Sequence, residues 1–64
     1  MAQFFRIVEQ VDGWWYRRGR ADLMRFANLD DAIKHATDIA SENSPSEVLV
    51  HHLNGRVQVV ASFE

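Results

Sequence analysis

The chain has 64 residues, no cysteine and a formal net charge of −2. This length makes one small domain, residues 1–64, and the lack of cysteine excludes disulfides and thiolate metal sites. A core of this size supplies only about 3–5 kcal/mol of stability, which raises the expectation of self-association. No apolar run reaches membrane-spanning length, so the sequence predicts a soluble, cytoplasmic protein without a membrane partner.

The charges are divided unequally along the chain. Residues 1–28 hold five arginines against three acidic residues, a net charge of +2. Residues 29–64 hold two basic against six acidic residues, a net charge of −4. Such polarity suits an anionic ligand, or two copies of the chain that meet head to tail.

The first part of the chain predicts three strands. Residues 3–11 are rich in aromatic and β-branched types, and Asp12-Gly13 is a strong signal for a two-residue type I′ turn. This turn pairs Val11 with Trp14, which gives a core face of Phe5, Ile7, Val11, Trp14 and Tyr16. The opposite face then carries Phe4, Arg6, Val8, Trp15 and Arg17. A second turn at residues 19–22 leads to a third strand over 23–27, whose inward side chains we expect to be Met24 and Phe26.

Residues 28–42 predict one amphipathic helix. Asn28 is a suitable N-cap, and Asp30 and Asp31 place negative charge in the first turn. Apolar residues then recur at steps of three and four, in the set Leu29, Ala32, Ile33, Ala36, Ile39 and Ala40. Because three of the six are alanines, the helix can lie close to the surface that it covers. It needs such a surface, since an isolated helix of this length is marginal in water.

A breaker cluster at residues 43–46 ends the helix, and two strands follow over 47–53 and 56–63, around a second type I′ signal at Asn54-Gly55. In that register the buried face carries Val48, Val50, His52, Val57, Val59, Ala61 and Phe63. The other face carries Leu49, His51, Leu53, Arg56, Gln58 and Val60. The predicted fold is therefore α+β, in the order βββ-α-ββ. It is a mainly antiparallel five-stranded sheet with one helix packed on one face. The strand order stays open, because either C-terminal strand can join the first three.

Several short motifs form a pattern that resembles a known family. They are Gly13-Trp14, Phe26 followed by Asp31-Ala32, and Val48-Leu49-Val50-His51 running into Asn54-Gly55-Arg56-Val57. The pattern resembles the short bacterial proteins grouped as domain of unknown function 2188, over about residues 5–60. Asn28 stands where that family usually has threonine, and Trp15 replaces a smaller residue. The resemblance implies the fold and carries no activity.

A weaker likeness, over residues 5–42 only, is to the AP2-type DNA-binding domains of plants. These also run three strands into a capped helix, and they read DNA with arginines and tryptophans on the sheet. Because folds host unrelated functions, this likeness alone is a poor argument for DNA binding.

The polar residues do not predict catalysis, a metal site or a cofactor. His51 and His52 are adjacent on a strand, so their side chains leave opposite faces and cannot share a metal. His35 lies on the helix flank near Asp31 and Asp38, which we expect to tune its charge. The serines have no nearby base, and no glycine-rich phosphate loop is present.

The run from Trp14 to Arg18 is the most informative stretch and has two interpretations. In the first, Trp14 and Tyr16 belong to the core, Trp15 packs across the strands and the arginines are solvated at the edges. In the second, a protein partner or nucleic acid contacts Arg6, Trp15, Arg17, Arg18, Arg20 and Arg25.

Apolar side chains are left on the face that the helix does not cover. They predict a homodimer surface of Phe4, Val8, Trp15, Leu49 and Val60. The sequence therefore predicts a small non-enzymatic binding module that forms a homodimer, with nucleic-acid binding as the alternative. The homodimer and nucleic-acid binding both require Trp15.

Overall fold

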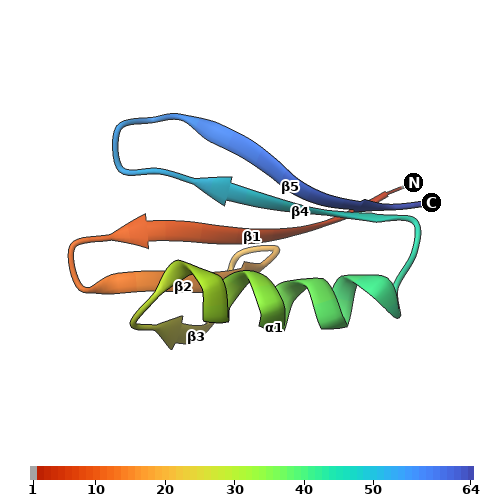
Figure 1. The fold of residues 1–64 in the computed structure, drawn as a ribbon, viewed down its shortest axis with the longest axis horizontal. Coiled ribbons are helices and arrows are strands. Elements are labelled where there is room, and N and C mark those ends of the chain that lie inside the picture. Colours follow the sequence, from red (N-terminus) through yellow and green to blue (C-terminus); the bar gives the residue numbers. More distant parts are fainter. Residues whose placement is uncertain (1) are drawn as a thin grey trace.

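Five strands and one helix make up residues 2–64, the part of the chain that the computed structural model describes (Figure 1). The elements are β1 (Gln3–Gln10), β2 (Gly13–Arg18), β3 (Ala21–Phe26), α1 (Leu29–Ser41), β4 (Ser46–His51) and β5 (Val57–Phe63). The strands form one sheet in the order β3-β2-β1-β4-β5, and α1 contacts all five of them. The predicted α+β fold is confirmed. The helix of residues 2–64 is too short and too polar to cross a membrane.

β1 lies at the centre of the sheet because the helix reverses the direction of the chain. Two hairpins lead from β1 to β3, and α1, about 20 Å long, then returns the chain along the sheet (Figure 1). β4 therefore begins at the same end as β1 and pairs with it in parallel, with Gln3 opposite Ser46 and Val8 opposite His51. This pairing gives the strand order that the sequence left open.

Side chains just outside α1 form hydrogen bonds with the free backbone groups at both of its ends. Asn28 is the N-cap as predicted, and its Oδ1 accepts a hydrogen bond of 3.0 Å from the backbone N–H of Asp31. At the other end, the buried Ser46 hydroxyl donates to the Ala40 carbonyl at 2.6 Å, and the Asn43 amide donates to the Ile39 carbonyl at 2.7 Å. Ser46 thus ties the end of the helix to the start of β4.

The predicted apolar stripe of α1 forms the core, and its alanines are the innermost residues. Ala32, Ala36 and Ala40 are fully buried, whereas Ile33 and Ile39 lie half-buried beside them. The large buried side chains come from the strands, and they are Phe5, Ile7, Tyr16, Val48 and Val50. A row of small side chains lets the helix lie directly on these larger ones.

β3 is an edge strand, and its inward side is only partly covered. Phe26 pairs with Trp14 and packs against the core, and Met24 pairs with Tyr16, so both point toward the helix as predicted. Met24 nevertheless stays 46% exposed, as five of the six residues of β3 are exposed.

The first hairpin turns one residue earlier than predicted, which shifts the pairing of its strands by two residues. Its loop is Val11–Asp12, with Gln10 opposite Gly13 and Ile7 opposite Tyr16. Because side chains alternate with a period of two, a shift of two residues leaves the predicted faces intact. Val11 is the exception, since it lies in the loop and is 96% exposed rather than in the core. Gly13, with φ of 139°, has no room for a side chain, because a Cβ would lie 2.8 Å from the Phe26 carbonyl oxygen.

The second hairpin contradicts the predicted type I′ turn. Its loop has three residues and ends on Gly55, which has φ of 90°, while the Arg56 carbonyl accepts from the His52 N–H at 2.8 Å. The extra loop residue shifts the pairing by one position, so Val57 and Val59 point away from the helix and are 53% and 55% exposed. Their predicted burial is wrong, and Gln58 takes the opposite face, beside Val50.

A β-bulge between Val48 and Leu49 restores the predicted pairing at the far end of this hairpin. Ala61 and Phe63 consequently return to the helix side, where Val60 also packs against the core. The prediction that Val60 lies on the uncovered face is therefore wrong.

The close approach of α1 gives a test of the packing. Ala36→Leu should lower the free energy of unfolding by about 1–3 kcal/mol, because the added methyl groups have no space against the sheet. Lys34→Leu places the same side chain at an exposed site and should stay within about 0.5 kcal/mol of the parent. Urea denaturation measures both. Equal reductions in stability would show that the alanine stripe is not the tightest contact.

Candidate functional site

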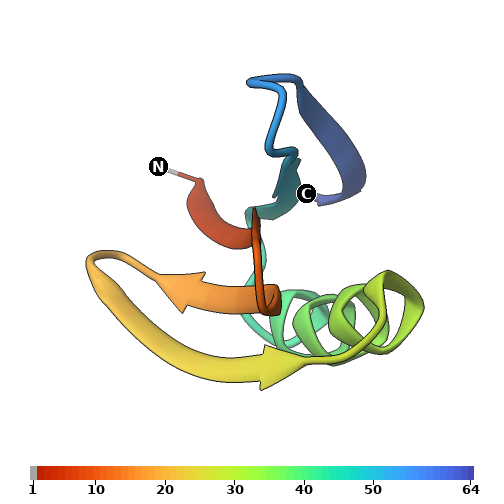
Figure 2. The ribbon, with the colours of Figure 1, turned by 90° about the vertical axis from the view of Figure 1, so that its left-hand side faces the viewer.

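The sheet face that α1 leaves uncovered brings together most of the predicted site residues. Figure 2 shows the helix on one side of the curved sheet. We call the other side of the sheet the outer face. The strand pairing arranges its side chains in two rows that run across the strands. The first row is Arg25, Trp15, Val8, His51 and Val57. The second row is Asp22, Arg17, Arg6, Leu49 and Val59, and beside it lie Phe4, Glu47 and Ser62.

The outer face is rich in apolar side chains. Phe4 is 44% exposed, Val57 and Val59 are more than half exposed, and Val8, Trp15 and Leu49 are half-buried. The predicted members Phe4, Val8, Trp15 and Leu49 therefore do lie together. Val57 and Val59 take the place of Val60. Sequence reasoning missed them because Asn54-Gly55 suits both a two-residue and a three-residue loop.

The arginines of the outer face are already engaged within the chain. Arg17 Nε lies 2.7 Å from Asp22 Oδ1 but is not aligned as a hydrogen-bond donor, so this contact is an ion pair. Arg25 Nη1 donates to the Asp12 carbonyl at 2.8 Å. The guanidinium of Arg6 lies 6.0 Å from the centre of the Phe4 ring.

The two other arginines of the predicted cluster lie outside the outer face. Arg18 pairs with Phe5 and so points to the helix side, where its guanidinium lies 5.2 Å from the Phe5 ring and donates to Gln3 at 3.1 Å. Arg20 is exposed in the loop between β2 and β3. The predicted six-residue cluster is therefore divided between two faces and a loop.

Opposite charges balance on the outer face. Arg6, Arg17 and Arg25 stand against Asp22, Glu47 and the rim residue Asp12, whose carboxylate accepts from the Trp15 indole N–H at 3.0 Å. Three charges of each sign leave no net charge. Such a surface suits a protein partner better than a polyanion.

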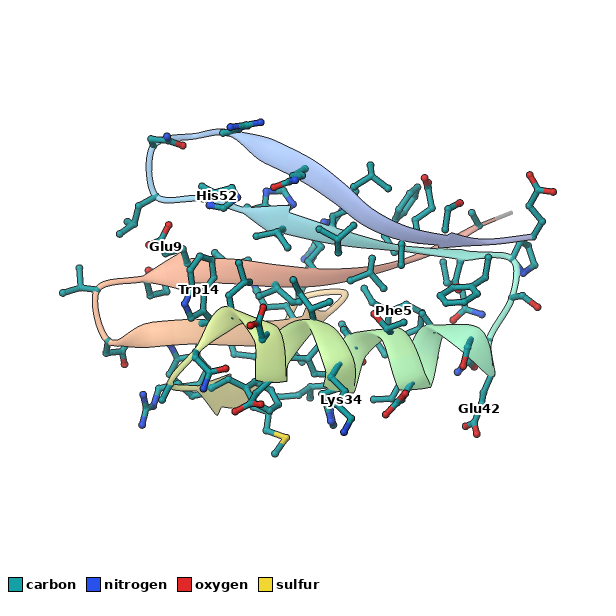
Figure 3. All side chains as sticks on the ribbon, viewed as in Figure 1. Phe5, Glu9, Trp14, Lys34, Glu42 and His52 are labelled. Carbon is teal, nitrogen blue, oxygen red and sulfur yellow. The ribbon has the colours of Figure 1, made fainter. Side chains whose placement is uncertain are left out.

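A second polar cluster lies on the helix side, where β1 meets the loop between β4 and β5 (Figure 3). Glu9 Oε1 accepts from the Leu53 N–H at 3.0 Å and lies 3.7 Å from His52 Nδ1. The His52 ring stands edge-on to Trp14, with 5.8 Å between ring centres, and its Nε2 lies 3.4 Å from Gln58 Oε1. These contacts hold the loop on β1. Among residues 2–64 no group of three or more His, Cys, Asp or Glu residues could hold a metal.

The two other histidines and Tyr16 lie away from this cluster. His51 lies on the outer face and His52 on the helix side, as predicted. His35 packs edge-on against Tyr16, with 4.9 Å between ring centres, and beside Phe26, rather than against the neighbouring carboxylates. Burial raises the pKa of the Tyr16 phenol, and the positive charge of Arg18 opposes this to a smaller extent. Tyr16 therefore stays protonated at neutral pH as part of the core.

The contact between Glu9 and Leu53 can be tested directly. Glu9→Ala removes the acceptor of the Leu53 N–H and should lower the free energy of unfolding by about 0.5–1.5 kcal/mol. Exchange of the Leu53 amide hydrogen, followed by NMR, should accelerate. Glu9→Gln keeps an acceptor oxygen and should retain much of the protection. If Glu9→Ala left the Leu53 exchange rate unchanged, the carboxylate would not hold the loop.

Comparison with known proteins adds one finding. No curated protein and no solved structure matches the chain. The model of a family described as an uncharacterized protein conserved in bacteria, DUF2188, matches residues 6–63. These residues run from the centre of the outer face, at Arg6, to the last residue of β5. The match covers nearly the whole chain, and the protein belongs to the DUF2188 family.

Proposed function

We propose that this protein is a non-enzymatic interaction module that binds through its outer face and forms a homodimer. One observation carries the proposal: four of the five strands contribute apolar side chains to a sheet face that the single helix leaves open. Contiguous apolar surface of this kind on a small domain marks an interaction site.

The edges of the sheet are less suited to association than its outer face. An exposed edge strand can recruit another strand through its free backbone groups, and bulges hinder this pairing. Both edge strands carry a register irregularity, β3 where it pairs with Tyr16 and Arg17, and β5 where it pairs with Val48 and Leu49. A partner is therefore expected to pack on side chains rather than to extend the sheet.

The local chemistry also favours binding over catalysis. Glu9 and His52 are used to hold a loop, and Tyr16 is part of the core. An acid–base pair in an enzyme needs groups that are free to meet a substrate. These side chains instead contact the protein's own backbone and rings.

Association through the outer face is testable with a matched pair of variants. The parent should run as a dimer in light scattering after gel filtration at tens of micromolar. Val59→Glu should return it to the monomer, because the substitution places a charge on the outer face at a site that is already exposed. Met24→Glu makes the same kind of change at a similarly exposed site on the helix side of an edge strand, and should leave the dimer intact. Trp15→Glu should behave as Val59→Glu does.

Two results would contradict this proposal. A parent chain that stays monomeric at several hundred micromolar would exclude the homodimer. A Val59→Glu variant that stays dimeric would place the interface elsewhere.

Nucleic-acid binding is the second candidate, because arginines flank Trp15 on the outer face. Arg25 lies opposite Trp15, and Arg17 is two residues further along β2. An exposed tryptophan flanked by arginines suits stacked bases and phosphates. Against it, Arg17 is neutralised by Asp22, and the Trp15 N–H already bonds to a carboxylate that would repel phosphate.

Titration of labelled single- and double-stranded oligonucleotides at low salt separates the two candidates. We expect no binding at tens of micromolar protein. If binding occurred through phosphates, the slope of log affinity against log salt would fall by about 0.7–0.9 for each phosphate that a variant no longer neutralises. Arg17→Ala with Arg25→Ala would then flatten that slope, and this result would replace the interaction module by a nucleic-acid-binding role.

A further inference from the structure

The outer face holds one charge of each sign, Arg6 and Glu47, that has neither an ion pair nor a side-chain hydrogen bond among residues 2–64. Arg6, on β1, stands directly opposite Arg17, and like charges in such a cross-strand pair repel. Asp22 neutralises Arg17, whereas the Arg6 guanidinium lies over the Phe4 ring. Glu47, on β4, is half-buried opposite Phe4. The two charges lie on the neighbouring inner strands β1 and β4, beside the apolar side chains Phe4 and Leu49.

We propose that a second copy packs its outer face on this one, and that Arg6 of each copy pairs with Glu47 of the other. This inference rests on the proposed homodimer and specifies its geometry. In a two-fold interface each contact occurs twice, so two unmatched charges of opposite sign on one face can satisfy each other in both directions. The self-complementary charges are the reason for choosing a second copy as the occupant.

The strand pairing favours one direction for the two-fold axis. An axis along the strands, between β1 and β4, lays β1 over the partner's β4 and β2 over the partner's β5. Arg6 then lies over the partner's Leu49, and the partner's Glu47 lies two residues further along, about 7 Å away in the plane of the sheet. The long arginine side chain can cover that distance.

The same axis buries the apolar residues and leaves out the edge strand β3. Trp15, on β2, faces the partner's Val57, and β3, which is mostly exposed, stays outside the interface. An axis across the strands at the level of Arg6 would instead set Arg6 against the partner's Arg6. The repulsion between these two like charges would destabilise that arrangement.

Reversal of the two charges tests the pairing. Arg6→Glu and Glu47→Arg should each weaken dimerisation at least about 100-fold, because each sets like charges against one another at both copies of the pair. The double variant should regain the dimer. An equimolar mixture of the two single variants should form a heterodimer, which native mass spectrometry separates by mass from the homodimer of either variant. Lys34→Glu and Glu42→Arg make the same charge changes at exposed positions of the helix and should leave the dimer unaffected (Figure 3).

The outcomes distinguish the homodimer from the proposed pairing of Arg6 with Glu47. A parent that is monomeric overturns the homodimer and the pairing together. A parent dimer that Val59→Glu breaks, but whose charge-reversed variants show no rescue in the double variant or the mixture, overturns only the pairing. If a reversal unfolds the chain, Arg6→Gln and Glu47→Gln replace it. Their effects on the dimerisation Kd should be non-additive in a double-mutant cycle, and additivity would overturn the pairing.

Discussion

The close contact between the alanines of α1 and the strands is the constraint on which the rest of the structure depends. Ala32, Ala36 and Ala40 let the helix axis approach Phe5, Ile7 and Val50, and so one short helix can contact all five strands. Residues 2–64 have one helix to cover the sheet. The core is therefore one-sided, and the outer face follows directly from how the length of the chain is divided between strands and helix.

The features that depend on the spacing of apolar residues were predicted from the sequence. The helix, its Asn28 cap and its alanine stripe agree with the structure, as do the two faces of the first hairpin. Those faces were correct despite the misplaced turn because an error of two residues preserves the side-chain alternation. The match to the DUF2188 family also agrees with the resemblance seen in the short motifs.

The register of the second hairpin could not be predicted from the spacing of apolar residues. The dipeptide Asn54-Gly55 is compatible with loops of two and three residues, and the difference of one residue exchanges the two faces. Val57 and Val59 could therefore not be placed from their pattern, and neither could the bulge that corrects the register beyond them. The partners of the arginines were also hidden, because the ion pair of Arg17 with Asp22 depends on how β3 pairs with β2.

The bulge of β5 and the three-residue loop before it have a consequence for how this protein can change over evolutionary time. One half of the strand, at Val57 and Val59, belongs to the outer face, and the other half, at Ala61 and Phe63, belongs to the core. Substitutions near the loop can therefore alter the outer face without disturbing the packing under the helix. Related chains can in this way diverge on that face while they keep a common fold, and the bulge is the boundary between the residues that are free to drift and those that are not.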